Sequence, residues 1–123
     1  MDLNVRVEEK ENGIFLVAPS GRLDTGTAPI LKKEIARVVL KAPRALILDM
    51  EGVDYISSMG VREIIQTRKK LSRIGGMLRV VNLRPPVKRV FEIIRALPPE
   101  DIFESVEEMD RYLDVIQREV REE

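Results

Sequence analysis

A short, nearly unbroken apolar run at Ala45–Met50 constrains the fold most, because it predicts a central strand that is covered on both faces. Gly52 and Asp54 follow with the chemistry of a turn, and from Val61 onward the apolar residues recur with helical spacing. The sequence therefore predicts a buried strand, a short turn and a helix in succession. We place the candidate functional site at this connection between strand and helix.

Two serines stand at the expected start of this helix. The hydroxyl of Ser57 or Ser58 can accept a hydrogen bond from a backbone N–H that the first helical turn leaves unpaired. The same free N–H groups and the helix dipole favour an anion, so a phosphoryl group would be stabilised there. The sequence alone is consistent with a purely structural helix cap and with a regulated hydroxyl.

Strands alternate with helices along the first half of the chain. Leu3, Val5 and Val7 alternate with polar residues and predict a half-exposed strand, which Asn12-Gly13 joins by a tight hairpin turn to an antiparallel strand at Ile14–Ala18. Asp24 is expected to be the N-cap of a first helix. The expected core positions of that helix are Ala28, Leu31, Ile35, Val38 and Val39.

The same alternation continues in the second half. The helix that begins near Ser58 is expected to bury Val61, Ile64, Ile65, Leu71 and Ile74 and to end at Gly75-Gly76. Met77–Val81 is a further buried strand. A third helix is expected from Pro85-Pro86 to Pro98-Pro99, with Val87, Val90, Phe91, Ile94 and Leu97 on its inner face. Ile102-Phe103 could form a last strand, and Ser105 opens a C-terminal helix whose apolar stripe, Val106, Met109, Leu113, Ile116 and Val120, is expected to pack on the domain.

These elements predict one α/β domain over residues 1–123. Its mixed sheet should have four or five strands, with the first strand antiparallel at an edge and Ala45–Met50 internal, and about four helices should cover it. The chain has neither cysteine nor histidine, so a zinc site is not expected and a serine–histidine hydrolase cannot be assembled. No metal and no cofactor are expected.

The overall charge favours a protein partner. Lysine plus arginine and aspartate plus glutamate each number 21, and this balance predicts no footprint for nucleic acid or for an anionic membrane. The N-terminus lacks a signal peptide pattern, and no stretch approaches the length of a membrane span, so a cytoplasmic location is expected. Abundant charged residues and the absence of cysteine suggest a thermophilic source.

The segment Leu48–Gly60, together with Gly21–Asp24 and the later Asn82-Leu83, resembles the STAS domains of bacterial anti-sigma factor antagonists. In that family a motif of the type Asp-Ser-Ser/Ala-Gly opens the helix, and its first serine is phosphorylated by a partner anti-sigma factor that is also a kinase. The resemblance places this serine at Ser58 and the motif glycine at Gly60. The motif aspartate is Ser57 here and the second small residue is Met59, so the chain departs from the pattern at two positions.

The resemblance implies a phosphorylation switch without catalytic residues in this chain. Unphosphorylated protein would bind the anti-sigma factor kinase, and a metal-dependent serine phosphatase would reverse the modification. Phosphorylation is expected at Ser58, with Ser57 as the second candidate, and the protein is expected to be a monomer or weak dimer. The expected partner-binding residues are Asp24, Tyr55, Ile56, Ser57, Met59, Gly60 and Arg62.

Three other functions compete with this one. A scaffold or ligand-binding module of the same fold that is never phosphorylated agrees with the changes at Ser57 and Met59. A nucleotide-binding module finds no support, because no glycine-rich phosphate-binding motif occurs. A serine hydrolase is disfavoured by the missing Gly-x-Ser-x-Gly motif and the missing histidine base.

Overall fold

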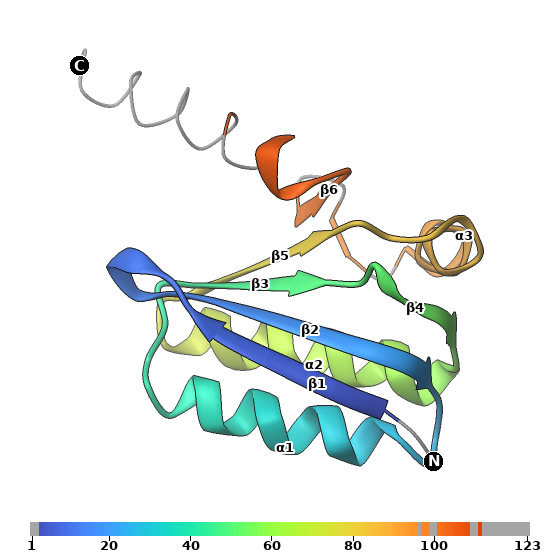
Figure 1. Ribbon diagram of the computed structural model, residues 1–123, viewed down its shortest axis with the longest axis horizontal. Coiled ribbons are helices and arrows are strands. Elements are labelled where there is room, and N and C mark those ends of the chain that lie inside the picture. The colour runs from blue at the N-terminus through green and yellow to red at the C-terminus, as the bar shows by residue number, and fades with distance from the viewer. Residues whose placement is uncertain (1–2, 96, 99–100, 109–110, 112–123) are drawn as a thin grey trace.

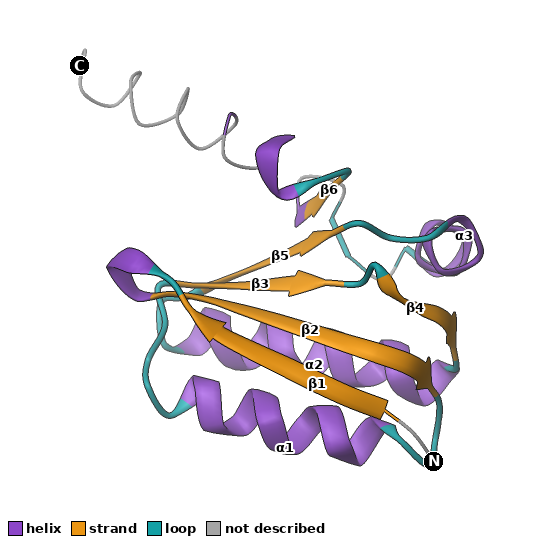
Figure 2. Ribbon diagram, in the orientation of Figure 1, coloured by secondary structure: helices purple, strands orange, loops and turns teal. Residues whose placement is uncertain are grey.

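The computed structural model describes residues 3–95, 97–98, 101–108 and 111. Within these residues the strands and helices follow one another as the sequence predicts, with one addition (Figures 1 and 2). The elements are β1 (Leu3–Glu9), β2 (Ile14–Leu23), α1 (Ala28–Val39), β3 (Ala45–Asp49), β4 (Gly52–Ile56), α2 (Ser58–Arg73), β5 (Met77–Val81), α3 (Pro85–Ile94) and β6 (Ile102–Phe103).

The strands form one mixed sheet in the order β1-β2-β3-β5-β6. Strand β1 pairs antiparallel with β2 at an edge of the sheet, and the pairs β2–β3, β3–β5 and β5–β6 are parallel. Because β3 lies between β2 and β5, the prediction that Ala45–Met50 is internal is confirmed. The antiparallel pairing of the first two strands is confirmed as well.

The strand that the sequence did not predict is β4. The ten-residue β2 is long enough to pair along its first half with β3 and along its second half with β4, so the sheet has six strands rather than four or five. Gly52 and Asp54 favour a turn by local chemistry, yet Val53 and Ile56 are buried and the pairing with β2 holds this segment extended. Tertiary pairing therefore overrides the local signal.

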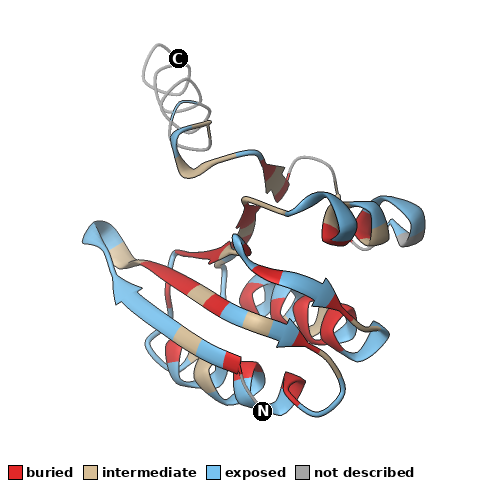
Figure 3. Ribbon diagram, turned by 45° about the vertical axis from the view of Figure 1, so that its right-hand side comes forward, coloured by how far each residue is buried: buried red, intermediate tan, exposed pale blue. Residues whose placement is uncertain are grey.

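Helices α1 and α2 lie along the same face of the sheet, and α3 lies beside β4 (Figure 1). The main core joins that face to its helices, and it includes Leu31 and Ile35 of α1 and Ile64 and Leu71 of α2. A smaller cluster, formed by Leu16, Ile47, Val81 and Phe103, contains the strand positions that alternate with those of the main core. Consecutive residues of β3, Ala45–Leu48, are therefore all buried, whereas β1 at the edge of the sheet is mostly exposed (Figure 3).

The predicted hairpin turn at Asn12-Gly13 is present, since both residues adopt left-handed conformations in the four-residue connection Lys10–Gly13 between β1 and β2. One predicted element boundary is wrong. The third helix ends at Ile94, and Arg95 follows with φ 49°, so Leu97 is buried outside the helix and the prolines are not its stop signal.

The inner faces of the helices are mostly as expected. Ile74 is the exception in α2, since it is the C-cap residue and is 47% exposed, while Gly75 takes the expected left-handed conformation. Ser105 opens a helical turn by accepting a hydrogen bond from the Glu108 N–H at 3.1 Å. The expected positions Met109, Leu113, Ile116 and Val120 and the side chain of Ile94 lie outside the described residues.

Candidate functional site

Ser57 is the N-cap of α2. Its Oγ accepts a hydrogen bond from the Gly60 N–H at 3.3 Å, and its own N–H donates to the Leu23 carbonyl at 2.9 Å. Ser58 is the first residue inside the helix and is exposed, and its hydroxyl has no hydrogen-bond partner in the described part of the chain. The two serines therefore differ in their surroundings, since Ser57 caps the helix and Ser58 is exposed.

Gly60 allows α2 to approach the sheet closely. A Cβ atom at this position would lie 2.8 Å from Ile56 Cγ1 and 2.9 Å from both the Cγ and the carbonyl oxygen of Leu23. Such distances are shorter than van der Waals contact, so only glycine fits here without displacement of the strand ends. The motif glycine consequently positions Ser58 at the carboxyl ends of β2 and β4.

The segment after β2 and the start of α2 lie side by side. Leu23 pairs with Ile56, and the Ser57 N–H continues the same ladder into the helix. A register shift between Gly21 and Arg22 lets the Arg22 guanidinium lie over the Tyr55 ring, 3.9 Å from its centroid. These two segments of the sequence therefore meet at one rim of the sheet, at the carboxyl ends of β2 and β4.

Asp24 shapes the turn before α1 rather than capping the helix. Its Oδ1 accepts hydrogen bonds from the N–H groups of Gly26 and Thr27, both at 3.0 Å. The N-cap residue of α1 is Thr27, whose hydroxyl donates to the Arg22 carbonyl at 2.6 Å. The prediction that Asp24 caps α1 is therefore wrong, since the N-cap lies three residues later at Thr27. The Asp24 carboxylate instead accepts hydrogen bonds from N–H groups of the preceding turn.

The expected partner-binding residues divide into exposed, half-buried and buried ones, and Asp24 and Ser57 are the half-buried ones. Tyr55 is 41% and Met59 is 42% exposed, and Arg62 is exposed as well. Ile56 is only 7% exposed and Gly60 is buried, so these two residues position the helix and cannot supply contact area. The exposed surface around Ser58 is thus formed by Tyr55, Met59 and Arg62.

A groove of about 490 Å³ extends from Met59 along α1 and α2. We define the α1–α2 groove by the residues that line it, namely Thr25, Ala28, Pro29, Lys32, Met59, Arg62, Glu63, Gln66 and Lys70. Glu63 is 9% exposed, and its Oε1 is buried without a hydrogen-bond partner among the residues that the structure describes. Burial raises the pKa of Glu63, and nearby Lys70 and Lys32 offset this only in part.

The sequence did not predict a role for Glu63. The residue stands between apolar core positions of α2, and a charged residue there is normally read as solvent-facing. Its burial depends on the packing of α1 against α2, for which the sequence carries no local signal.

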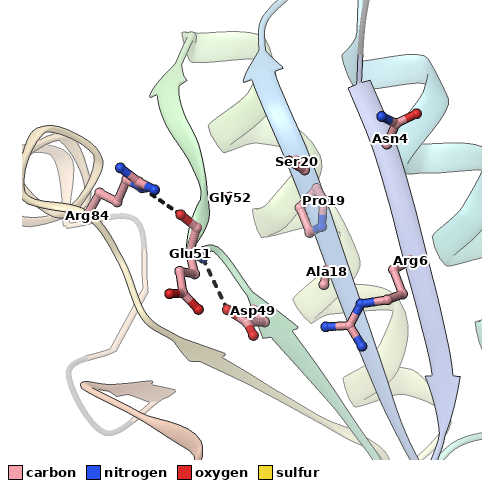
Figure 4. Close-up of a pocket in the computed structure, with 9 residues that line it drawn as sticks. All are labelled: Asn4, Arg6, Ala18, Pro19, Ser20, Asp49, Glu51, Gly52 and Arg84. Atoms are coloured by element: carbon pink, nitrogen blue, oxygen red, sulfur yellow. Dashed lines mark hydrogen bonds between the residues drawn. The ribbon is translucent and has the colours of Figure 1, made fainter.

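A second hollow, of about 330 Å³, lies between β1, the turn from β3 to β4, and the start of α3 (Figure 4). Arg84 donates a hydrogen bond to the Glu51 carbonyl, and Asp49 Oδ1 accepts one from the Glu51 N–H at 3.1 Å. Arg6 and Arg84 share this hollow with the two acidic residues, and none of the expected partner-binding residues lines it. The hollow is therefore separate from the surface around Ser58.

Neither a metal site nor a membrane-spanning helix occurs among the described residues. No group of three or more acidic, cysteine or histidine side chains there could hold a metal ion. No described helix combines the length and the apolar character that a membrane crossing requires.

Comparison with known proteins identifies the family. A model of the STAS domain matches residues 5–109. BtrV of Bordetella bronchiseptica, named as an anti-sigma factor antagonist, is 35% identical over 85 residues, which cover 69% of this chain and 73% of BtrV. The anti-sigma-B factor antagonist of Bacillus subtilis is 30% identical over 93 residues, which cover 76% and 84% of the two chains.

Solved structures agree with this assignment. The crystal structure of an anti-sigma factor antagonist from Mycobacterium paratuberculosis has a TM-score of 0.75 at 28% identity and covers 94% of this chain and 95% of its own. Unphosphorylated SpoIIAA also has a TM-score of 0.75, at 17% identity, over 93% and 96% of the two chains, and it supports the fold alone. The chain therefore belongs to the STAS-domain family of anti-sigma factor antagonists.

Proposed function

We propose that the unphosphorylated protein binds an anti-sigma factor of the serine kinase type, and that phosphorylation of Ser58 by this partner ends the association. The observation that carries the proposal is the division of roles at the start of α2, where Ser57 caps the helix and Ser58 is exposed between Tyr55, Met59 and Arg62. Members of the family are non-enzymatic regulators, so the kinase and a metal-dependent serine phosphatase supply the chemistry.

The start of α2 can tolerate a phosphate without loss of the fold. A phosphoserine at position 58 would add about 1.5 to 2 negative charges at neutral pH, close to the positive end of the helix dipole. Those charges would be costly only where a partner covers the surface. A loss of about 3 kcal/mol in binding is roughly a hundredfold in affinity, which is sufficient to release a partner.

The names of the relatives support the choice of partner. BtrV and the Bacillus subtilis protein are both named for antagonism of an anti-sigma factor. We propose that this chain acts in the same way, in the cytoplasm, as a monomer or weak dimer.

Phosphorylation with the purified anti-sigma factor and ATP tests this function. The anti-sigma factor is identified by affinity capture from the native cytoplasm, and the modified peptide is then mapped by fragmentation. We expect phosphate on Ser58 of the wild-type protein and none on Ser58→Ala, which should still bind. Phosphate on Ser57, or binding that phosphorylation leaves unchanged, would contradict the proposal.

A Met59→Glu variant tests the surface. A carboxylate in the contact should weaken binding about tenfold or more, while thermal stability stays unchanged because Met59 is exposed. Binding of the anti-sigma factor without any phosphate transfer would instead support a scaffold of the same fold that is not phosphorylated.

A further inference from the structure

Positive charge is concentrated in the two helices that cover one face of the sheet. Helices α1 and α2 together contain eight lysine and arginine residues and two glutamates, although the whole chain contains 21 of each charge type. Six positive charges are therefore in excess on these helices, and the rest of the chain carries the matching acidic excess. The face of the molecule formed by these two helices is therefore basic although the net charge of the chain is zero.

Three of these cations line the α1–α2 groove. Lys32, Arg62 and Lys70 form no ion pair within 4.0 Å in the described part of the chain. By contrast, Arg37 and Arg68 are engaged with Glu34 and Asp101. The cations of the groove are available to a partner, whereas others on the same helices are already neutralised.

The groove also contains apolar surface, and its chemistry favours a polypeptide over a nucleic acid. Pro29 and Met59 contribute exposed apolar surface to it, and the buried Glu63 carboxyl lies among its cations. A nucleic acid would bring phosphates near this carboxyl and would meet the acidic excess elsewhere on the protein. A polypeptide can place carboxylates on the cations and apolar side chains between them.

We propose that the α1–α2 groove binds an acidic segment of the anti-sigma factor, with Lys32, Arg62 and Lys70 pairing with its carboxylates. This proposal rests on the proposed function and specifies the chemistry of the partner surface. The groove begins at Met59, next to Ser58, so it is continuous with the surface that the modification would alter.

Arg62 connects the groove to the modification. It follows Ser58 by one helical turn, at the i, i+4 spacing at which side chains on a helix meet. A phosphate on Ser58 would pair with Arg62 and would repel the carboxylates of the bound segment. Both effects act in the direction of release, which explains how one modification can end binding along the whole groove.

Charge reversal at the groove tests this proposal. Affinity for the purified anti-sigma factor is measured by calorimetry for Lys32→Glu, Arg62→Glu and Lys70→Glu, and for Lys10→Glu as a control with the same charge change on the exposed loop between β1 and β2. We expect each groove variant to bind about tenfold more weakly and the control to stay within about twofold of wild type. Wild-type affinity should also fall as NaCl rises from about 50 to 300 mM.

The outcomes separate the two proposals. If the wild-type protein binds the anti-sigma factor with an affinity that does not depend on salt, and the three charge-reversal variants bind equally well, the groove proposal is overturned and the proposed function remains. A wild-type protein that does not bind the anti-sigma factor at any salt concentration overturns both. Heparin, single-stranded DNA and a synthetic acidic peptide are also compared as competitors of the anti-sigma factor. If heparin or the DNA displaces the anti-sigma factor at a lower concentration than the peptide does, the groove binds polyanions, and the proposal of an acidic protein segment is overturned. Thermal melts of each variant confirm that the fold is retained.

Discussion

Gly60 is the residue at which α2 comes closest to the sheet. Replacing a glycine with alanine inside a helix normally stabilises a protein by up to about 1 kcal/mol. Here we expect Gly60→Ala to destabilise the fold by about 1 to 3 kcal/mol, because its Cβ would lie 2.8 Å from Ile56 Cγ1. Urea unfolding measures the change, and Met59→Ala is the control because that neighbouring side chain is exposed. A gain in stability for Gly60→Ala would show that the helix start can shift.

Glu63 makes stability depend on pH. Burial raises the pKa of Glu63 above the ordinary 4.5 of a glutamate, so the folded state holds the proton more tightly than the unfolded state does. Stability is therefore lost as pH rises from about 4.5 through the folded pKa. We expect Glu63→Gln to be more stable than wild type at pH 7, with the difference shrinking toward pH 4. Unfolding experiments across this range measure it, and Glu11→Gln, at an exposed site, should show no such difference. An equal gain at pH 4 and pH 7 would contradict the role of the charge.

At the scale of elements, the first turn of α2 brings together a serine that caps the helix, Ser57, and an exposed serine, Ser58. Ser57→Ala removes the hydrogen bond to the Gly60 N–H and should destabilise the protein by about 1 kcal/mol. Ser58→Ala should leave the free energy of unfolding unchanged, because no described residue bonds its hydroxyl. Denaturant unfolding of both variants checks the contrast, and equal losses would show that Ser58 also supports the fold.

At the scale of the whole molecule, Asp101 joins the segment before β6 to the rest of the domain. Its carboxylate lies 2.9 Å from Arg68 Nε of α2 and 2.9 Å from Arg79 Nη1 of β5. Asp101 is 6% exposed and the Arg79 side chain is 16% exposed, so Asp101→Asn would weaken a mostly buried ion pair with Arg79 as well as the more exposed pair with Arg68, at a cost of about 2 kcal/mol.

The matched control for Asp101 is an exposed ion pair. Glu104 contacts Lys88 at 2.7 Å, and Glu104→Gln should change the free energy of unfolding by less than about 1 kcal/mol because solvent screens this pair. Calorimetric melts of both variants measure the difference. Similar melting temperatures for the two variants would show that Asp101 contributes no more than a surface residue.

Local signals in the sequence are sufficient for several of the elements. Alternating apolar residues predict β1, short apolar runs predict β3 and β5, and the helical spacing of apolar residues predicts the helices. Small polar residues mark the start of α2, and the motif around Ser58 is enough to indicate the family. Each of these features depends on residues that are close together in the chain.

Other features depend on distant residues and arise only in the folded molecule. Gly52–Ile56 is a strand because β2 offers it a parallel partner, against its own turn chemistry. Glu63 is buried because α1 packs beside α2. The basic groove also depends on distant residues, because the zero net charge of the chain gives no information on where its charges lie in the fold. Folding places them, because the helices that share one face of the sheet bring Lys32 and Lys70 together across the groove.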